Sequence, residues 1–201
     1  MVPAAGLAHG RAGTVLLLAR LAAADPDAKY AGIARKKATE LAAEASVLAV
    51  LAGRLTARPL AVSWCQGLAG IALALNEAGV LLAEPDLVRV AVGLTDHCLA
   101  WVPRLSTVGQ CCGLAGVGSM LIELAPARSR FGAAGHPDGG GSEVAGQLLR
   151  RSAGPATEPV FQRAGQRPDL SFSTGSAGLL AFFRELRDAG QQPATATARR
   201  R

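Results

Sequence analysis

The stretch Ser63-Trp64-Cys65-Gln66-Gly67-Leu68-Ala69-Gly70-Ile71 leads into an apolar run that extends to Leu82. Its centre, Gly-x-Ala-Gly, occurs four times in the chain, and we call these copies the glycine repeats: residues 10–13, 67–70, 113–116 and 175–178. An apolar run follows each copy. Glycine lets backbones approach closely, so several helix starts of this kind can crowd around one point. The intervals between copies hold two helices each, which predicts a stack or ring of helical hairpins.

Helices are expected both after the glycine repeats and between them. The four apolar runs predict helices at residues 14–23, 71–82, 117–124 and 179–186. Between them, helices are predicted at residues 33–51, 86–101 (with Asp86 as a cap) and 144–149. The helix at 33–51 is expected to expose Lys36, Lys37, Glu40 and Glu44 and to bury Ile33, Leu41, Leu48 and Leu51. Residues 131–141 and 154–168 are interpreted as loops.

The composition favours a single all-α domain. Half of the 201 residues are hydrophobic, but aromatic residues make up only 4%. The apolar residues are chiefly Ala, Leu and Val, and Ala and Leu are among the strongest helix formers. A chain of this length suits one domain with its own core. We therefore predict one all-α domain over residues 1–190 and a disordered basic tail over residues 191–201.

The net charge of +6 does not indicate a nucleic-acid partner. Three of the positive charges are Arg199, Arg200 and Arg201, at the end of the polar tail. The others are spread over the body of the chain, without the basic stripe interleaved with aromatic residues that marks a nucleic-acid surface. The tail is better explained as a solvated charge run.

Residues 15–19 could pass for the apolar part of a secretory signal, but Arg20 interrupts the run and a glycine repeat precedes it. We interpret this segment as a helix. No segment approaches about 18 uninterrupted apolar residues, so no membrane span is predicted. The expected location is the cytoplasm, where the four cysteines stay reduced and metal binding becomes their most interesting use.

The two residues before each glycine repeat carry the chemistry: Ala8-His9, Cys65-Gln66, Cys111-Cys112 and Ser173-Thr174. A ring of helix starts would bring these pairs together, so that three thiols and one imidazole could converge. Zn²⁺ takes thiolate and imidazole ligands, and helix N-termini favour thiolate over thiol. A vicinal Cys111–Cys112 disulfide would be strained, which makes metal ligation the better explanation of that pair. Cys98 lies outside the repeats and is interpreted as a buried apolar side chain.

These motifs resemble those of the lanthionine synthetase C-like (LanC-like) cyclases. Residues 64–70 resemble the family's Trp-Cys-x-Gly-x-x-Gly motif, and residues 111–116 are similar to its Cys-His-Gly-x-x-Gly motif. Residues 6–13 resemble the Gly-x-Ala-His-Gly-x-x-Gly segment near the active site, and residues 173–180 the last glycine repeat. Cys112 stands where many members have His, which resembles a Cys-Cys-Gly subgroup found among bifunctional lanthipeptide synthetases.

The resemblance implies an α/α toroid with zinc at its centre, present here as the C-terminal part of a cyclase domain and therefore as an incomplete ring. The implied zinc ligands are Cys65, Cys111 and Cys112, and the implied acid/base group is His9. The implied reaction adds peptide cysteine thiols to dehydroalanine or dehydrobutyrine and forms thioether rings. The implied partners are a dehydrated precursor peptide and a dehydratase or kinase, as a domain or as a separate protein.

Two departures from the family pattern leave other functions open. Stand-alone cyclases have an Arg shortly before Trp-Cys, and residues 60–63 contain none. The early hairpins of the family, which carry an active-site Asp, have no counterpart in the chain. One alternative is a LanC-like zinc protein that binds another thiol, such as glutathione. The other is a non-catalytic interaction module in which zinc is structural. A carbohydrate-active toroid is disfavoured, because aromatic platforms and a convincing carboxylate pair are absent.

Overall fold

The computed structural model describes residues 5–25, 29–54, 58–132, 140–152 and 170–191. Every regular element within these ranges is a helix, which confirms the predicted all-α class. The α-helices are α1 (Arg11–Ala24), α2 (Tyr30–Ala52), α3 (Leu68–Leu81), α4 (Pro85–Trp101), α5 (Leu114–Arg130), α6 (Gly141–Ser152) and α7 (Ser176–Gln191). Two short 3-10 helices, η1 (Pro59–Val62) and η2 (Val102–Arg104), precede the second and third glycine repeats.

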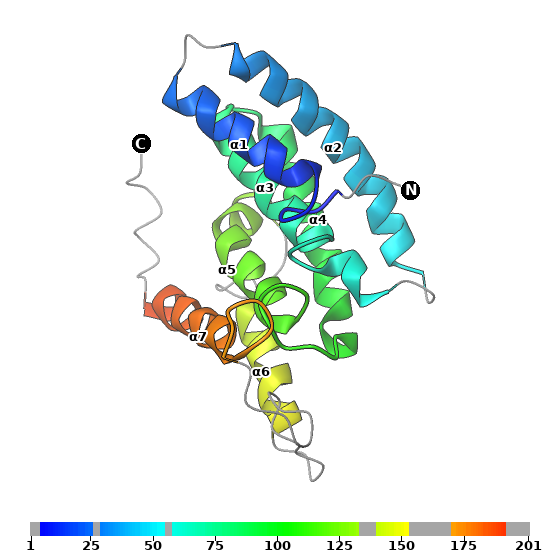
Figure 1. Cartoon of the computed structure of the whole chain (residues 1–201), viewed down its shortest axis with the longest axis vertical. Coiled ribbons are helices and arrows are strands. Elements are labelled where there is room, and N and C mark those ends of the chain that lie inside the picture. Colours follow the sequence, from blue (N-terminus) through cyan, green and yellow to red (C-terminus); the bar gives the residue numbers. More distant parts are fainter. Residues whose placement is uncertain (1–4, 26–28, 55–57, 133–139, 153–169, 192–201) are drawn as a thin grey trace.

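The helices form a partial toroid of helical hairpins, as the repeats predict. The four helices that follow the glycine repeats, which we call the repeat helices, pack on one another in the order α1, α3, α5 and α7. Helices α2, α4 and α6 each pack against the repeat helix that precedes them. In Figure 1, α1 stands at one end of this arrangement and α7 at the other. The core includes Leu75, Leu121 and Phe182 of the repeat helices, which are fully buried.

The second glycine of each repeat is required by a close backbone contact. A Cβ added at Gly70 would lie 2.0 Å from the Trp64 carbonyl oxygen, and one at Gly116 would lie 2.0 Å from that of Gln110. Gly13 and Gly178 face carbonyl oxygens placed the same way, at 2.4 and 2.1 Å. No side chain fits at these distances. The segment before each repeat therefore folds back onto the first turn of its own helix.

The repeat helices start about one turn earlier than predicted, because the repeat itself forms that turn. Helix α3 begins at Leu68, directly after Gly67, and α5 begins at Leu114, directly after Gly113. The preceding segment supplies acceptors for the otherwise unpaired N–H groups of the first turn. In α5, for example, Leu114 donates to the Thr107 carbonyl at 3.0 Å and Ala115 to that of Val108 at 3.1 Å.

The buried face of α2 differs from the prediction. Ile33 and Leu51, which were expected in the core, are exposed, and Glu44 is half-buried and forms an ion pair with Arg11. Apart from Leu41, the buried residues are alanines: Ala34, Ala38, Ala42, Ala45, Ala49 and Ala52. Helix α2 packs against α1, α3 and α4, and methyl side chains let it do so closely. Ile33 and Leu51 therefore lie outside the buried contact.

Three smaller corrections concern the ends of elements. Helix α4 begins at Pro85 with Glu84 as its N-cap residue, so Asp86 is not the cap but a first-turn residue that pairs with Arg89. Helix α6 is longer than the predicted 144–149: it begins at Gly141, which was expected in the loop, and the Gly140 carbonyl accepts from the Val144 N–H. The predicted loop at 154–168 and residues 192–201 of the predicted tail lie outside the described residues, whereas Gln191 ends α7.

No helix in the described ranges is long and apolar enough to cross a membrane.

Candidate metal centre

A backbone ladder joins the segments that precede the four repeat helices. The Ala8 N–H donates to the Cys65 carbonyl at 3.1 Å, and the Cys65 N–H donates to the Cys111 carbonyl at 3.1 Å. The Cys111 N–H in turn donates to the Ser173 carbonyl at 2.8 Å. These four residues each lie two positions before the first glycine of a repeat. The ladder therefore brings the equivalent positions of all four repeats together, as the sequence predicts.

The ladder gathers the three thiols that the sequence singles out. Cys65 Sγ and Cys112 Sγ lie 3.1 Å apart, and the Cys112 thiol donates to Cys111 Sγ at 3.5 Å. All three sulfur atoms lie within 4.8 Å of one another, a spacing at which one metal ion could be held. Cys65 is 1% exposed, whereas Cys111 and Cys112 are half-buried. The cluster is thus anchored in the core on one side and reachable from solvent on the other.

The three thiols have different proton affinities. Burial raises the pKa of Cys65, but the hydrogen bonds between Cys65 and Cys111, Cys112 and Ser63 outweigh burial, and the net shift of the Cys65 pKa is downward. Burial raises the pKa of Cys111 and of Cys112, and the hydrogen bond to Cys65 adds to both shifts. Among the three thiols, Cys65 is therefore the one that most readily becomes a negatively charged thiolate. The positive ends of α3 and α5, which start directly after these segments, favour that charge.

Ser63 is a neighbour of the cluster that sequence reasoning missed. Its side chain is buried and its Oγ lies 3.7 Å from Cys65 Sγ. The same hydroxyl donates to the Leu60 carbonyl at 2.9 Å and accepts from the Gln66 N–H at 3.2 Å. Ser63 therefore holds the turn that carries Cys65. Gln110, next to Cys111, is also buried, and its Oε1 has no hydrogen-bond partner in the described part of the chain.

His9 and Cys98 have different surroundings. His9 is exposed and follows Ala8, the ladder residue that bonds to Cys65. The loop that carries it packs tightly on this segment: a Cβ added at Gly6 would lie 2.2 Å from Gln66 Cα. Cys98, in contrast, is fully buried in α4, and burial raises the pKa of its thiol to about 12. Cys98 is not part of the cluster, in agreement with its interpretation as a core residue.

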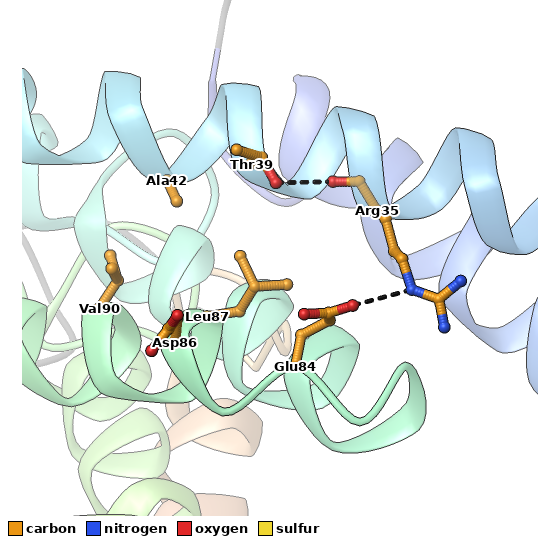
Figure 2. A pocket seen from close by; sticks show the side chains of 7 residues that line it. All are labelled: Arg35, Thr39, Ala42, Glu84, Asp86, Leu87 and Val90. Atoms are coloured by element: carbon orange, nitrogen blue, oxygen red, sulfur yellow. Dashed lines mark hydrogen bonds and ion pairs between the residues drawn. The ribbon is translucent and has the colours of Figure 1, made fainter.

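Two cavities lie near α2. The larger, of about 430 Å³, is lined by residues of α2, of α4 and of the turn before α4, and the Arg35–Glu84 ion pair of 2.8 Å joins two of its lining residues (Figure 2). None of the cluster thiols lines it. The smaller, of about 220 Å³, lies between the end of α2 and the second glycine repeat, and is lined in part by Gln66 and Gly67. It is therefore the cavity that adjoins the segment of Cys65.

The ladder, the glycine contacts and the thiol cluster agree with a comparison of the sequence with known families. The model of a family described as "Lanthionine synthetase C-like protein" matches residues 3–129, which is more than half of the chain. The chain belongs to the lanthionine synthetase C-like family. The match covers the first three glycine repeats and all three clustered cysteines. No curated protein matches the chain.

The zinc that the resemblance implies fits the residues of this LanC-like chain. Three sulfur donors within 4.8 Å form a soft donor set, which suits Zn²⁺ better than the hard oxygen-seeking cations. The half-buried thiols of Cys111 and Cys112 leave one side of the cluster open, as a three-ligand site with a further exchangeable position requires. The cluster could therefore hold a metal ion and still admit a further sulfur ligand.

Proposed function

We propose that this chain is a zinc-dependent, thioether-forming cyclase-type protein. Its substrate would be a dehydrated precursor peptide, in which a cysteine thiol adds to dehydroalanine or dehydrobutyrine. The observation that carries the proposal is the three-thiol cluster, gathered by the backbone ladder and open on the side of Cys111 and Cys112. Membership of the LanC-like family supports it. A dehydratase or kinase, as a domain or as a separate protein, would supply the dehydrated peptide.

Cys65, Cys111 and Cys112 would hold the zinc ion. A bound zinc would lower the pKa of a substrate thiol in its open position, so that thiolate is available near neutral pH. The chain itself fixes the position of the ligands through the ladder and through Ser63, which bonds the turn around Cys65. Because the ligands must stay reduced, a reducing compartment such as the cytoplasm suits the reaction.

The addition is redox-neutral. The substrate thiol first releases its proton. Its sulfur then forms a bond to Cβ of the dehydro residue, the carbon–carbon π bond breaks, and the electron pair passes to the enolate. One proton then goes to Cα, and we assign its delivery to His9. This histidine is exposed, and its loop packs on the Cys65–Gln66 backbone. It is therefore accessible to a bound peptide beside the cluster.

The test is thioether formation by the zinc-loaded protein. A synthetic peptide with one cysteine and one dehydroalanine is incubated with the protein, and its free thiol is then titrated with N-ethylmaleimide. Cyclisation removes the reactive thiol without a change in peptide mass. Cys98→Ala should act like the wild type, whereas Cys65→Ala should not act. A peptide that keeps its thiol, together with zinc-dependent binding of glutathione in calorimetry, would replace the cyclase by a thiol-binding function. Absence of both would leave zinc with a structural role.

His9→Asn tests the assignment of the proton donor. The substitution should leave the zinc content unchanged and slow thioether formation by roughly 10²-fold or more, the usual scale of general acid–base catalysis. Both quantities are measured on one preparation. Zinc loss would instead identify His9 as a ligand, and an unchanged rate would reject either role.

A further inference from the structure

Each repeat helix has two faces that meet its neighbours in the row. Phe182 of α7 shows how they fit: its ring lies so close to Gly118 of α5 that a Cβ added there would be 2.3 Å from it. Phe182 is the seventh residue after the first glycine of its repeat, and Gly118 is the fifth after that of its own. The face near position seven therefore meets the preceding repeat, and the face near position five meets the following one.

The face toward the preceding repeat consists of the seventh and eleventh residues after the first glycine. In α3 these are Ala74 and Ala78, and in α5 they are Met120 and Leu124; all four are fully buried. In α1 the same positions hold Leu17 and Leu21, which are 58% and 37% exposed. We call these two leucines the α1 edge. The α1 edge is the only one of these faces with no repeat helix before it in the described residues.

The face toward the following repeat consists of the fifth and eighth residues. Leu75 in α3 and Leu121 in α5 are fully buried, and so is Val15 in α1. In α7 these positions hold Leu180 and Phe183, which are 54% and 36% exposed. We call these two residues the α7 edge. Elsewhere in the chain, the residues equivalent to the α7 edge pack against those equivalent to the α1 edge. The two edges are therefore the two unpaired halves of the same kind of interface.

The backbone ladder reaches both edges, and one charge pair fits the same junction. In the described residues the ladder runs from Ala8 to Ser173, so its last member in each direction lies at one of the two edges. Ten residues after the first glycine, α1 carries Arg20 and α3 carries Glu77, and these pair at 2.6 Å across the first junction. The equivalent residue of α7 is the exposed Glu185. A junction from α7 to α1 would place this acid beside Arg20, which already binds Glu77. The two junctions of α5 differ, because they bring Glu123 near the like charges of Glu77 and Glu185.

We propose that a second copy of this chain docks head to tail, with the α7 edge of one copy packed against the α1 edge of the other. The junction repeats the contact that Phe182 makes on Gly118, with Leu17 on Leu180. Two copies satisfy both edges if the row closes on itself, and longer assemblies form if it does not. The proposal concerns assembly and does not depend on the proposed catalytic function.

The experiment measures self-association of the full chain by sedimentation velocity from micromolar to submillimolar concentrations. The wild type should form concentration-dependent dimers or larger assemblies. Leu17→Glu and Leu180→Glu should each weaken the association by at least about tenfold, since each buries a charge in one half of the junction. The control is Val47→Glu, because Val47 is 60% exposed on α2 and belongs to neither edge. Circular dichroism checks that each variant keeps its helices.

Mixing the two edge variants gives the decisive result. The Leu17→Glu chain keeps its α7 edge and the Leu180→Glu chain keeps its α1 edge, so the mixture should restore one junction and give heterodimers. Each variant alone should associate at least about tenfold more weakly than the wild type. A wild type that stays monomeric throughout would overturn the proposal. So would an association that only one of the two substitutions weakens, because that would indicate a symmetric contact of one edge with itself.

Discussion

At the scale of single residues, the register of the glycine repeats determines which cysteines meet in the candidate metal centre. Cys65 and Cys111 occupy the same ladder position in successive repeats, and Cys112 follows directly. An alignment of the glycine repeats therefore predicts which three of the four cysteines converge. The structure adds the arrangement: a buried Cys65 with a lowered thiol pKa, and two half-buried thiols with raised pKa values.

The first prediction is a metal content of about one zinc per chain, bound through these three sulfurs. Cys65→Ala and Cys111→Ala should lose most of the metal, because removal of one thiolate leaves two protein donors. Cys98→Ala is the matched control: Cys98 is fully buried in α4 and outside the cluster, so this variant should keep its zinc. The measurement is elemental analysis of purified protein. Full zinc retention in both ligand variants would rule out the assignment.

The contact between Ser63 and Cys65 could not be predicted from the sequence. Its contact with Cys65 Sγ depends on the turn that returns from η1, and not on the glycine pattern. A serine before a Trp-Cys pair carries no such signal in the sequence. His9 is a mixed case, because the repeat register places it next to the ladder residue Ala8, but the direction of an exposed side chain does not follow from register.

At the scale of elements, the glycine contacts are the tightest constraint. Gly116→Ala would place a methyl group 2.0 Å from the Gln110 carbonyl oxygen and 3.0 Å from Trp64 Cβ. The backbone next to Cys111 would have to move. We expect a loss of about 2–3 kcal/mol in the free energy of unfolding, the upper range for overpacking, together with weaker zinc binding.

Gly93→Ala is the matched control for this prediction. Gly93 lies in the exposed face of α4, and a Cβ added there meets nothing within 4 Å. Alanine is the better helix former, so this variant should gain about 0.5–1 kcal/mol. Urea unfolding measures both variants. A Gly116→Ala protein as stable as the wild type would show that the segment before α5 is not held in this close contact.

Glu123 gives a pH-dependent prediction at the junctions of α5. Partial burial, followed by the negative charges of Glu77 and Glu185, raises the pKa of Glu123 above its ordinary 4.5, and Arg20 only partly opposes this. The folded state thus binds the proton more tightly than the unfolded state, and this side chain costs stability as the pH rises past its ordinary pKa. Glu123→Gln should therefore raise the melting temperature by about 1–2 °C at pH 7 and lose this advantage below about pH 4.

Glu40→Gln is the control of opposite sign. The hydrogen bond from Lys37 lowers the pKa of this exposed carboxylate, so its contribution is favourable above its ordinary pKa and fades as the pH falls. This substitution should lower the melting temperature slightly at pH 7 or leave it unchanged. The measurement is the melting temperature of both variants, relative to the wild type, at acidic and at neutral pH. A Glu123→Gln variant less stable than the wild type at pH 7 would contradict the predicted sign.

The helix predicted at 33–51 is confirmed and Leu41 is buried as expected, but part of the predicted buried face of α2 was wrong, for a reason that belongs to this scale. Periodicity identifies the helix, and large apolar residues are expected to face the core. Here the contact is made by Ala34, Ala38 and Ala45, while Ile33 and Leu51 stay exposed. A sequence pattern assigns the largest apolar residues to the core. The close approach of α2 to its neighbours instead favours alanine, and the distance between helices is set by the tertiary structure. The order of elements and the all-α class were predictable, but the face that α2 presents was not.

At the scale of the whole molecule, the ladder ties the metal centre to the stability of the fold. It joins the starts of all four repeat helices, so unfolding of the domain separates Cys65 from Cys111 and Cys112. Zinc that binds the folded cluster and not the unfolded chain must then stabilise the entire domain. Cys98 offers an independent reporter of that stability, since it is fully buried in α4 and its thiol pKa is about 12.

The last prediction is that free zinc controls the reactivity of Cys98, although Cys98 does not bind it. Cys98 should react with iodoacetamide only when the core opens, because burial both hides the thiol and suppresses its thiolate. Above the dissociation constant, each tenfold rise in buffered free zinc should slow Cys98 labelling about tenfold, provided that reclosing outpaces alkylation. Peptide mass spectrometry measures the rate. In Cys65→Ala the same zinc series should have no effect. Fast, zinc-independent labelling of Cys98 in the wild type would mean that α4 opens without disrupting the ladder.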